Sequence, residues 1–233
     1  MTMMKLFLPV AFAFAVGCFT GLLFQQYLGV GWLLHKVGMP RQIPLNPHQQ
    51  ARIDLLRNLP LPNNAIVFLG DSLVDSYEWH ESFPSRRVVV RAISGARSED
   101  FAEIFDFERA TALFVLVGAN DAGFHVDPQK FERNYRRFLK SIPKRATVHL
   151  LSIPPIRKHG RRTVEPYHVI RLNQVLQTIA ADSGHVFLDL HEALSKENSA
   201  FSEDGLHLST LGYARFIELV APKVNHLLAE PPE

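Results

Sequence analysis

A serine, an aspartate and a histidine in this sequence have the residue types and spacing needed for covalent acyl transfer. Ser72 stands in Gly-Asp-Ser-Leu directly after the apolar run 66–69, and Asp204 and His207 share the segment Asp-Gly-Leu-His. A serine hydroxyl is a weak nucleophile until a neighbouring base takes its proton. A histidine can do so at neutral pH, and an aspartate can orient the ring and stabilise its charged form. The alternative for Ser72 is a helix N-cap, a position that serine and aspartate also favour.

Two further residues could stabilise the negative oxygen that forms during acyl transfer. Gly95, in Ile-Ser-Gly, could offer a backbone amide, and Asn120, in Gly-Ala-Asn-Asp, could offer a side-chain amide. Together with the amide of Ser72 they would form an oxyanion hole. Taken singly, Asn120-Asp121 and Asp204-Gly205 are also common turn pairs. The catalytic interpretation therefore requires all of these residues to meet at one place.

The elements that would position them alternate from residue 65 onward, which predicts an α/β fold with a parallel sheet and helices on both faces. Apolar runs predict five strands, and apolar spacing predicts helices between them; the strands are residues 65–69, 88–93, 112–117, 147–153 and 186–190, and the helices are residues 48–59, 98–105, 128–142, 164–182 and 210–228. Ser72, Gly95 and Asn120 follow the first three strands, and Asp204 and His207 come after the fifth. The carboxyl ends of parallel strands share one rim of the sheet, so the five residues are predicted to converge there.

Four blocks in this order resemble those of the GDSL/SGNH hydrolases, and the likeness is closest to the platelet-activating-factor acetylhydrolase-like serine esterases. They are Gly70-Asp71-Ser72-Leu73, Ile93-Ser94-Gly95, Gly118-Ala119-Asn120-Asp121 and Asp204-Gly205-Leu206-His207. The resemblance covers about residues 62–229. One departure is visible in the second block, where relatives often carry Asn-x-Gly before the Ile and Asp-Thr after the Gly; here the flanks are Arg91-Ala92 and Ala96-Arg97.

The resemblance implies a flavodoxin-like three-layer α/β/α sandwich with a five-stranded parallel sheet. It also implies a serine esterase that needs no metal or other cofactor. In that family pattern Ser72 is the nucleophile, Asp204 and His207 complete the triad, and Ser72, Gly95 and Asn120 form the oxyanion hole.

The expected function is hydrolysis of carboxylic esters of lipids, glycans or small molecules through an acyl-enzyme. Two alternatives stay open. An O-acyltransferase acting on a cell-envelope sugar would use the same triad, with a sugar hydroxyl in place of water. A binding protein could keep the fold without useful turnover. The sequence does not separate these, because pocket shape selects the acceptor.

The first 37 residues are predicted to be a membrane anchor. Residues 6–34 carry no charged side chain, and about 20 apolar residues suffice to cross a bilayer. A cleaved signal peptide and a lipoprotein signal ending at Cys18 are the alternatives. The apolar residues that follow Cys18 disfavour the lipoprotein signal, and the lack of a small-x-small site before a polar start disfavours cleavage. The expected organisation is an anchor in residues 1–37, a proline-containing spacer and short helix in 38–61, and the hydrolase domain in 62–233. We expect a single-pass protein with its catalytic domain on the periplasmic or extracellular side.

Composition excludes several other classes. The formal net charge is +2, which favours no nucleic-acid partner. Cys18 is the sole cysteine, so no internal disulfide can form, and no histidine pair has the His-x-x-x-His spacing of a helical zinc site. The oligomeric state is not indicated.

Two segments near the predicted rim could line a substrate pocket. His125 lies just past the Asn120 block. Residues 154–162 follow the fourth strand and carry Arg157, Lys158, His159, Arg161 and Arg162. This loop would either attract an anionic substrate or lipid headgroups beside the anchor, with Arg157 at the pocket, or be an ordinary solvated loop. Asp121 is predicted to be structural, and the remaining histidines of the domain, His159 among them, are predicted to be surface or packing residues.

Overall fold

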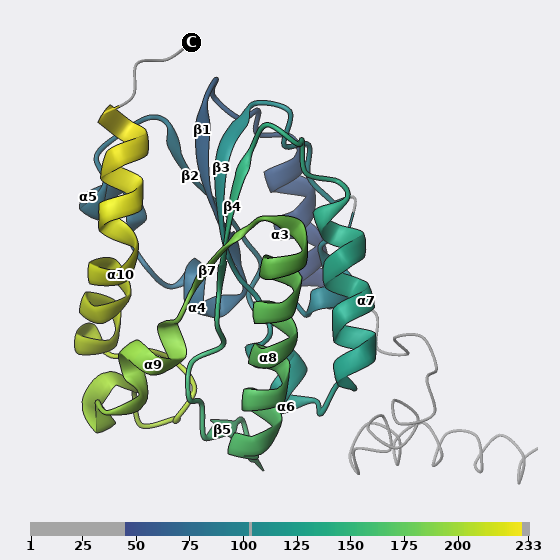
Figure 1. Ribbon diagram of the computed structural model, residues 1–233, viewed down its shortest axis with the longest axis vertical. Coiled ribbons are helices and arrows are strands. Elements are labelled where there is room, and N and C mark those ends of the chain that lie inside the picture. The colour runs from purple at the N-terminus through teal and green to yellow at the C-terminus, as the bar shows by residue number, and fades with distance from the viewer. Residues whose placement is uncertain (1–44, 103, 230–233) are drawn as a thin grey trace, which may run out of the picture. The chain divides into compact units, whose positions relative to one another are not determined.

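The computed structural model describes residues 45–102 and 104–229, and these form an α/β domain around a parallel sheet (Figure 1). The strand order is β2-β1-β3-β4-β7, and every neighbouring pair is parallel. The strands are β1 (Ala65–Gly70), β2 (Val88–Ala92), β3 (Ala110–Leu116), β4 (Thr147–Leu151) and β7 (Val186–Leu188). The five-stranded parallel sheet is therefore confirmed. Four strands begin at the predicted residue, and β3 begins two residues early.

Helices cover both faces of the sheet. Figure 1 shows α10, α5 and α9 on one side and α3, α7 and α8 on the other. The helices are α3 (Pro47–Arg57), α4 (Ser72–Asp75), α5 (Trp79–Ser82), α6 (Ala119–Gly123), α7 (Pro128–Leu139), α8 (Pro166–Ser183), α9 (Leu190–Ser195) and α10 (Thr210–Ala229). Because the chain moves from β1 outward to β2 and then returns to β3, the ends of β1 and β3 flank the point where the direction of winding reverses. Ligands of open α/β sheets gather at such a point.

The core is organised around β1, whose six residues are all buried. The Phe68 ring stacks on Trp79 with centroids 3.8 Å apart and on Phe114 at 5.1 Å. The indole nitrogen of Trp79 donates to the carbonyl of Val74 at 2.8 Å, so this buried polar group is satisfied. These contacts hold the segment after β1 firmly against the sheet.

The predicted helix at residues 98–105 is wrong. The structure has a 3-10 turn at Ser98–Asp100 followed by irregular backbone. The amide and hydroxyl of Ser98 donate to the Asp121 carboxylate at 2.9 and 2.6 Å. Phe101 and Phe105 are nonetheless buried. Long-range packing and hydrogen bonding therefore use the apolar residues that the sequence pattern assigned to a helix.

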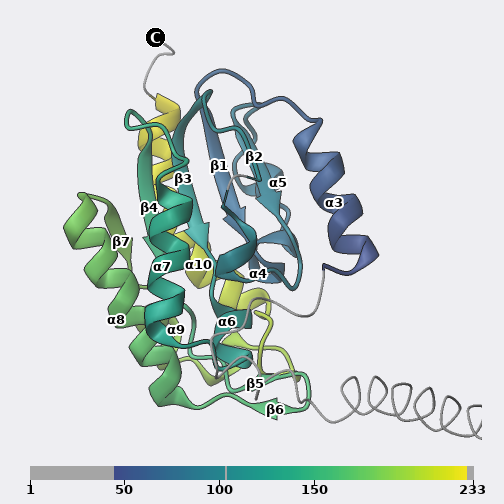
Figure 2. The ribbon, with the colours of Figure 1, turned by 90° about the vertical axis from the view of Figure 1, so that its right-hand side faces the viewer.

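The loop after β4 contains a short antiparallel hairpin, β5 (Lys158–His159) with β6 (Arg162–Thr163). Figure 2 shows it beside α6, at the end of the domain to which the strands point. Among residues 45–102 and 104–229, no helix is long and apolar enough to cross a membrane. The predicted anchor in residues 1–37 lies outside the described residues.

Candidate active site

Ser72 is placed at the carboxyl end of β1 as the first residue of α4. Asp71 is the N-cap of this helix, and its carboxylate accepts from the amide of Leu73 at 3.0 Å. Gly70 allows the close turn, since a Cβ there would lie 2.5 Å from the carbonyl oxygen of Leu116. The helix cap and the nucleophile are therefore different residues. Asp71 caps the helix, and the Ser72 hydroxyl remains available for another partner.

That partner is His207, which joins Ser72 to Asp204 in one hydrogen-bonded chain. His207 Nε2 lies 2.9 Å from Ser72 Oγ, and His207 Nδ1 lies 2.6 Å from Asp204 Oδ2. An ionised carboxylate only accepts hydrogen bonds, so Nδ1 carries the proton that faces Asp204. In the neutral ring Nε2 is then free to accept the Ser72 hydroxyl proton. The structure thus brings together the three residues predicted as a triad.

Asp204 is held in its charged form by the turn that carries it. Its carboxylate accepts from Ser202 Oγ at 2.8 Å and from the amides of Leu206 and His207 at 2.9 Å. Partial burial raises the pKa of Asp204, but these hydrogen bonds and the one to the His207 ring outweigh it and hold the pKa well below its usual range. The acid of the chain is therefore ionised throughout the neutral range.

Two backbone amides near Ser72 are available as donors. Within the described part of the chain, neither the amide of Ser72 nor that of Gly95 donates to a protein acceptor. Gly95 has φ +77°, a conformation that a side chain would strain, and a Cβ there would lie 2.9 Å from Gln49 Nε2. Gln49, from α3, donates to the carbonyl of Ser94 at 2.9 Å and so fixes this turn. No pattern in the sequence indicates that α3 supports the rim.

Asn120 is buried under the rim, and both ends of its amide have partners. Nδ2 donates to the carbonyl of Ala96 at 2.9 Å and lies 3.3 Å from Asp71 Oδ2. Oδ1 lies 2.9 Å from His159 Nε2. Asn120 thus contacts Asp71, Ala96 and His159, which follow β1, β2 and β4 in the chain.

Asp71 is fully buried, and burial raises its pKa to about 7, against the opposing effect of hydrogen bonds from the amides of Leu73 and Gly118. The negative charge of Asp121 adds to the rise. Asp121 is itself buried, and burial raises its pKa to about 6 although the amide and hydroxyl of Ser98 bind it. Its carboxylate ties α6 to the turn at Ser98, a structural position in keeping with the prediction.

The two predicted pocket residues lie at different places. His125 is exposed, and its ring is 5.6 Å from that of His168. Arg157 is exposed too, and its amide donates to the carbonyl of Gly205 at 2.9 Å, next to Asp204. Among the described residues, no hydrogen bond or ring contact joins His125 to Ser72 or His207. A substrate role for His125 or for Arg157 therefore stays a prediction.

His159 is the site residue that the sequence analysis missed. It was predicted to be a surface or packing residue, and its ring does pack against Gly123 and Phe124. Its contact with Asn120, however, spans 39 positions of the chain. A two-strand hairpin brings the residues together, and no local pattern around His159 indicates its partner.

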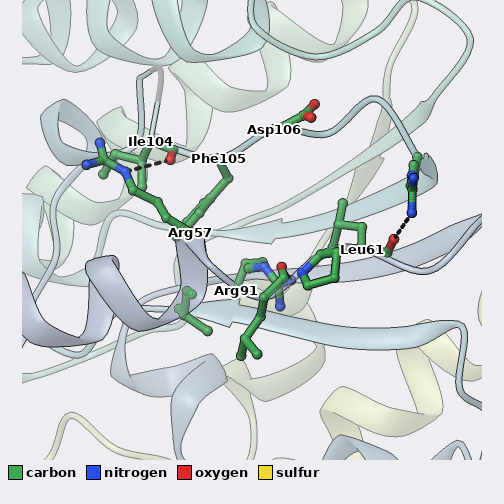
Figure 3. A pocket seen from close by; sticks show the side chains of 10 residues that line it. Arg57, Leu61, Arg91, Ile104, Phe105 and Asp106 are labelled. Carbon is green, nitrogen blue, oxygen red and sulfur yellow. Dashed lines mark hydrogen bonds between the residues drawn. The ribbon is translucent and has the colours of Figure 1, made fainter.

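A cavity of about 390 Å³ lies elsewhere, between the end of α3 and the segments that precede β1 and β3. Apolar side chains, Asp106 and three arginines line it. Figure 3 shows Arg57 turned toward the carbonyl of Ile104, to which its Nε donates at 3.0 Å. Arg91 donates to the carbonyls of Val90 and Leu59, and Arg109 to that of Leu61. These guanidinium groups therefore bind nearby backbone carbonyls, and no residue of the triad lines the cavity. In the same described ranges, no three His, Cys, Asp or Glu side chains are grouped as a metal site would require.

Comparisons with known proteins bear on the family and the fold. The model of the GDSL-like Lipase/Acylhydrolase family matches residues 68–215. No curated protein sequence matches the chain. Among solved structures, a GDSL-like lipase from Bacteroides thetaiotaomicron has 19% identity and a TM-score of 0.64, with 76% of this chain and 97% of that chain covered. The lipase/acylhydrolase from Enterococcus faecalis has 20% identity and a TM-score of 0.60, with 72% and 98% covered. An acetylxylan esterase from Geobacillus stearothermophilus has 16% identity and a TM-score of 0.55, with 71% and 96% covered. These structures share the fold.

Proposed function

Because the chain belongs to the GDSL-like lipase/acylhydrolase family and is thus an ester hydrolase, we propose that it cleaves carboxylic esters through an acyl-enzyme formed on Ser72. The observation that carries this proposal is the continuous hydrogen-bonded chain from Ser72 through His207 to Asp204. A nucleophile, a base and an orienting acid in that arrangement are what covalent acyl transfer requires.

The reaction begins when Ser72 Oγ attacks the carbonyl carbon of the ester and His207 Nε2 takes the hydroxyl proton. Asp204 stabilises the imidazolium ion that results. His207 then gives the proton to the alcohol oxygen as the ester bond breaks, which leaves the acyl group on Ser72. A water molecule, deprotonated by His207, attacks the acyl carbon. The bond from that carbon to Ser72 Oγ then breaks, the acid is released, and His207 returns the proton to Ser72 Oγ.

The negative oxygen of each tetrahedral intermediate would be bound by the amides of Ser72 and Gly95 and by Nδ2 of Asn120. The contact of Nδ2 with Asp71 is longer, at 3.3 Å, than its contact with the Ala96 carbonyl, at 2.9 Å. The hydrogen facing Asp71 is therefore the one that can be given to the oxyanion. Such donors act most strongly where water is excluded, and Asn120 is buried.

The direct test is Ser72→Ala assayed with p-nitrophenyl acetate. Loss of turnover with unchanged thermal unfolding would support the nucleophile, and turnover close to that of the unchanged protein would refute it. A series of p-nitrophenyl esters of rising acyl length then identifies the ester class. Preference for acetate favours glycan or small-molecule esters, the class that the name of the acetylxylan esterase neighbour indicates for that protein, and preference for long chains favours lipids.

The proposal includes anchoring of the enzyme by residues 1–37, with the catalytic domain outside the cytoplasm. The uncharged stretch 6–34 supports it, and every proposed catalytic residue lies after the spacer. A chain that begins at Gly38 should stay in the soluble fraction and keep its turnover of soluble esters, whereas the full chain should sediment with membranes. A reporter fused after Glu233 tests export, and a signal from the cytoplasm would contradict it.

A further inference from the structure

The β5–β6 hairpin touches both sides of the proposed active site. On one side, the amides of Arg157 and Lys158 donate to the carbonyl of Gly205 at 2.9 and 3.3 Å, within the turn that carries Asp204 and His207. On the other side, His159 Nε2 lies 2.9 Å from Asn120 Oδ1. Figure 2 shows the hairpin beside α6, the helix that carries Asn120. One short segment thus contacts the turn that carries the base and the acid on one side, and the side-chain oxyanion donor on the other.

The Ala96 carbonyl and His159 together hold the Asn120 amide in one orientation. A side-chain amide has one accepting end and one donating end of nearly equal size. The carbonyl of Ala96 can only accept, so it selects Nδ2 at 2.9 Å. His159 lies at the opposite end, and Oδ1 can only accept, so Nε2 is the donor there. Rotating the amide by half a turn would place oxygen against oxygen at Ala96, and it would place the NH₂ group against the Nε2–H of His159.

The ring of His159 is itself held in place. It lies over Gly123, where a Cβ would come within 2.2 Å of its Cγ, and it meets the edge of Phe124 at a centroid distance of 5.1 Å. Burial lowers the pKa of His159, and Arg162 lowers it further. The ring is therefore neutral at neutral pH and carries a single proton, which the contact with Oδ1 places on Nε2.

We propose that His159 is a positioning residue that orients the Asn120 side-chain amide toward the developing oxyanion. The inference rests on the proposed function, in which Asn120 is an oxyanion donor. His159 makes no contact with the reacting atoms in this assignment. Its effect should therefore appear in kcat, through the transition state, and leave KM nearly unchanged.

The test compares His159→Phe, His159→Gln and the matched control His185→Phe. Phenylalanine fills the space over Gly123 without a donor, and glutamine supplies an N–H of similar reach. Burial lowers the pKa of His185 as it does that of His159. His185 precedes β7, however, and so lies at the amino end of that strand, away from the proposed active site. We expect His159→Phe to lose about tenfold in kcat, the scale of one hydrogen bond, His159→Gln to recover most of it, and His185→Phe to match the unchanged protein. If His159→Phe matched His185→Phe, the inference would be overturned.

A double-mutant cycle with Asn120→Ala separates positioning from a general structural role. If His159 acts through Asn120, His159→Phe should cost nothing further once the amide is gone. The same tenfold loss in both backgrounds would overturn the inference, because it would locate the effect elsewhere. Should phenylalanine lower the unfolding temperature, the smaller His159→Leu takes its place in the cycle.

The Ser72→Ala control distinguishes a failure of the proposed function from a failure of the role of His159. If that variant keeps its turnover, the proposed function and this inference fail together. If Ser72→Ala is inactive and the cycle is additive, only the role of His159 fails.

Discussion

The proposed active site has an exposed side and a buried side, and each contains one aspartate with a different environment. The Asp204 side chain is 50% exposed, and hydrogen bonds from its own turn hold its pKa well below the usual range. Asp71 is fully buried on the other side of Ser72, and burial raises its pKa to about 7. At neutral pH the exposed acid is charged, whereas the buried acid is only partly ionised.

The difference shows that a carboxylate near a serine need not share in the chemistry. Asp204 meets the base directly and can stabilise its charge. Asp71 caps α4 and accepts hydrogen bonds from the amides of Leu73 and Gly118, so its role is structural: it links the segments that follow β1 and β3. Equivalent substitutions on the two sides should therefore have unlike consequences.

The largest expected effect on the exposed side is that of Asp204→Asn. An asparagine lacks the negative charge that stabilises the imidazolium ion, and its NH₂ group can select the wrong ring tautomer of His207. We expect a loss on the order of 10³–10⁴ in kcat, as for the acid of other triads. Glu203→Gln, at the exposed neighbouring residue, is the control and should be neutral. A loss of less than tenfold for Asp204→Asn would remove Asp204 from the mechanism.

On the buried side, the largest effect on rate should come from Asn120→Ala. Removal of one oxyanion donor costs about 10²–10³ in kcat, with KM little changed. Asn134→Ala is the matched control, because the Asn134 amide donates to Ser98 Oγ and contacts no proposed catalytic residue in the described structure. Steady-state kinetics with p-nitrophenyl acetate measure both variants. Equal rates for the two variants would mean that Asn120 is only a structural residue.

The same contrast explains what the sequence could predict. Asp204 and His207 lie in one turn, and each strand contains an apolar run, so local patterns were enough to indicate that pair and the sheet. The partners on the buried side are distant in the chain: Gln49 reaches Ser94 across 45 positions, and His159 reaches Asn120 across 39. Their pairing follows from how α3 and the hairpin pack, and residue types alone do not specify it. The missed irregular segment at 98–105 has the same origin, since Asp121 binds Ser98 from another element.

Asp71→Asn should change stability and its pH dependence. Because the pKa of Asp71 rises from 3.8 to about 7 on folding, the folded protein keeps a proton that the unfolded chain loses between these values. Its contribution to stability is thus fully present below about pH 4 and is lost as pH rises toward 7. Asparagine still accepts as an N-cap and has no charge to bury.

Urea unfolding at several pH values measures this effect. The free energy of unfolding of Asp71→Asn relative to the unchanged protein should rise between about pH 4 and pH 7, by a few kcal/mol, on the order of 4. Unpaired N–H groups add an offset that does not vary with pH. The exposed Asp54→Asn serves as the control. A difference that stays flat across this range would show that Asp71 is already charged in the folded protein at low pH.

The smallest predicted effect concerns the outer face of the hairpin, which joins the two sides. Arg161 and Arg162 are exposed there, and the Arg162 guanidinium lies 4.8 Å from the centroid of the Phe124 ring. Inward, the hairpin holds Gly205 and Asn120; outward, it presents the positive charge of Arg161 and Arg162. If this charge recruits anionic esters, changing both arginines to Gln should raise KM for an anionic ester by about two- to fivefold at low salt and leave a neutral ester unaffected.

The matched control changes Arg86 and Lys144 to Gln. Both residues are exposed, and both precede strands, so they lie at the amino ends of the strands, away from the proposed active site. Raising the salt to about 0.5 M should remove the difference, since exposed charges are then screened within a few ångströms. An equal rise in KM for neutral and anionic esters would instead mean that the substitutions disturb the inner contacts of the hairpin, and the loop would then have no role in recruitment.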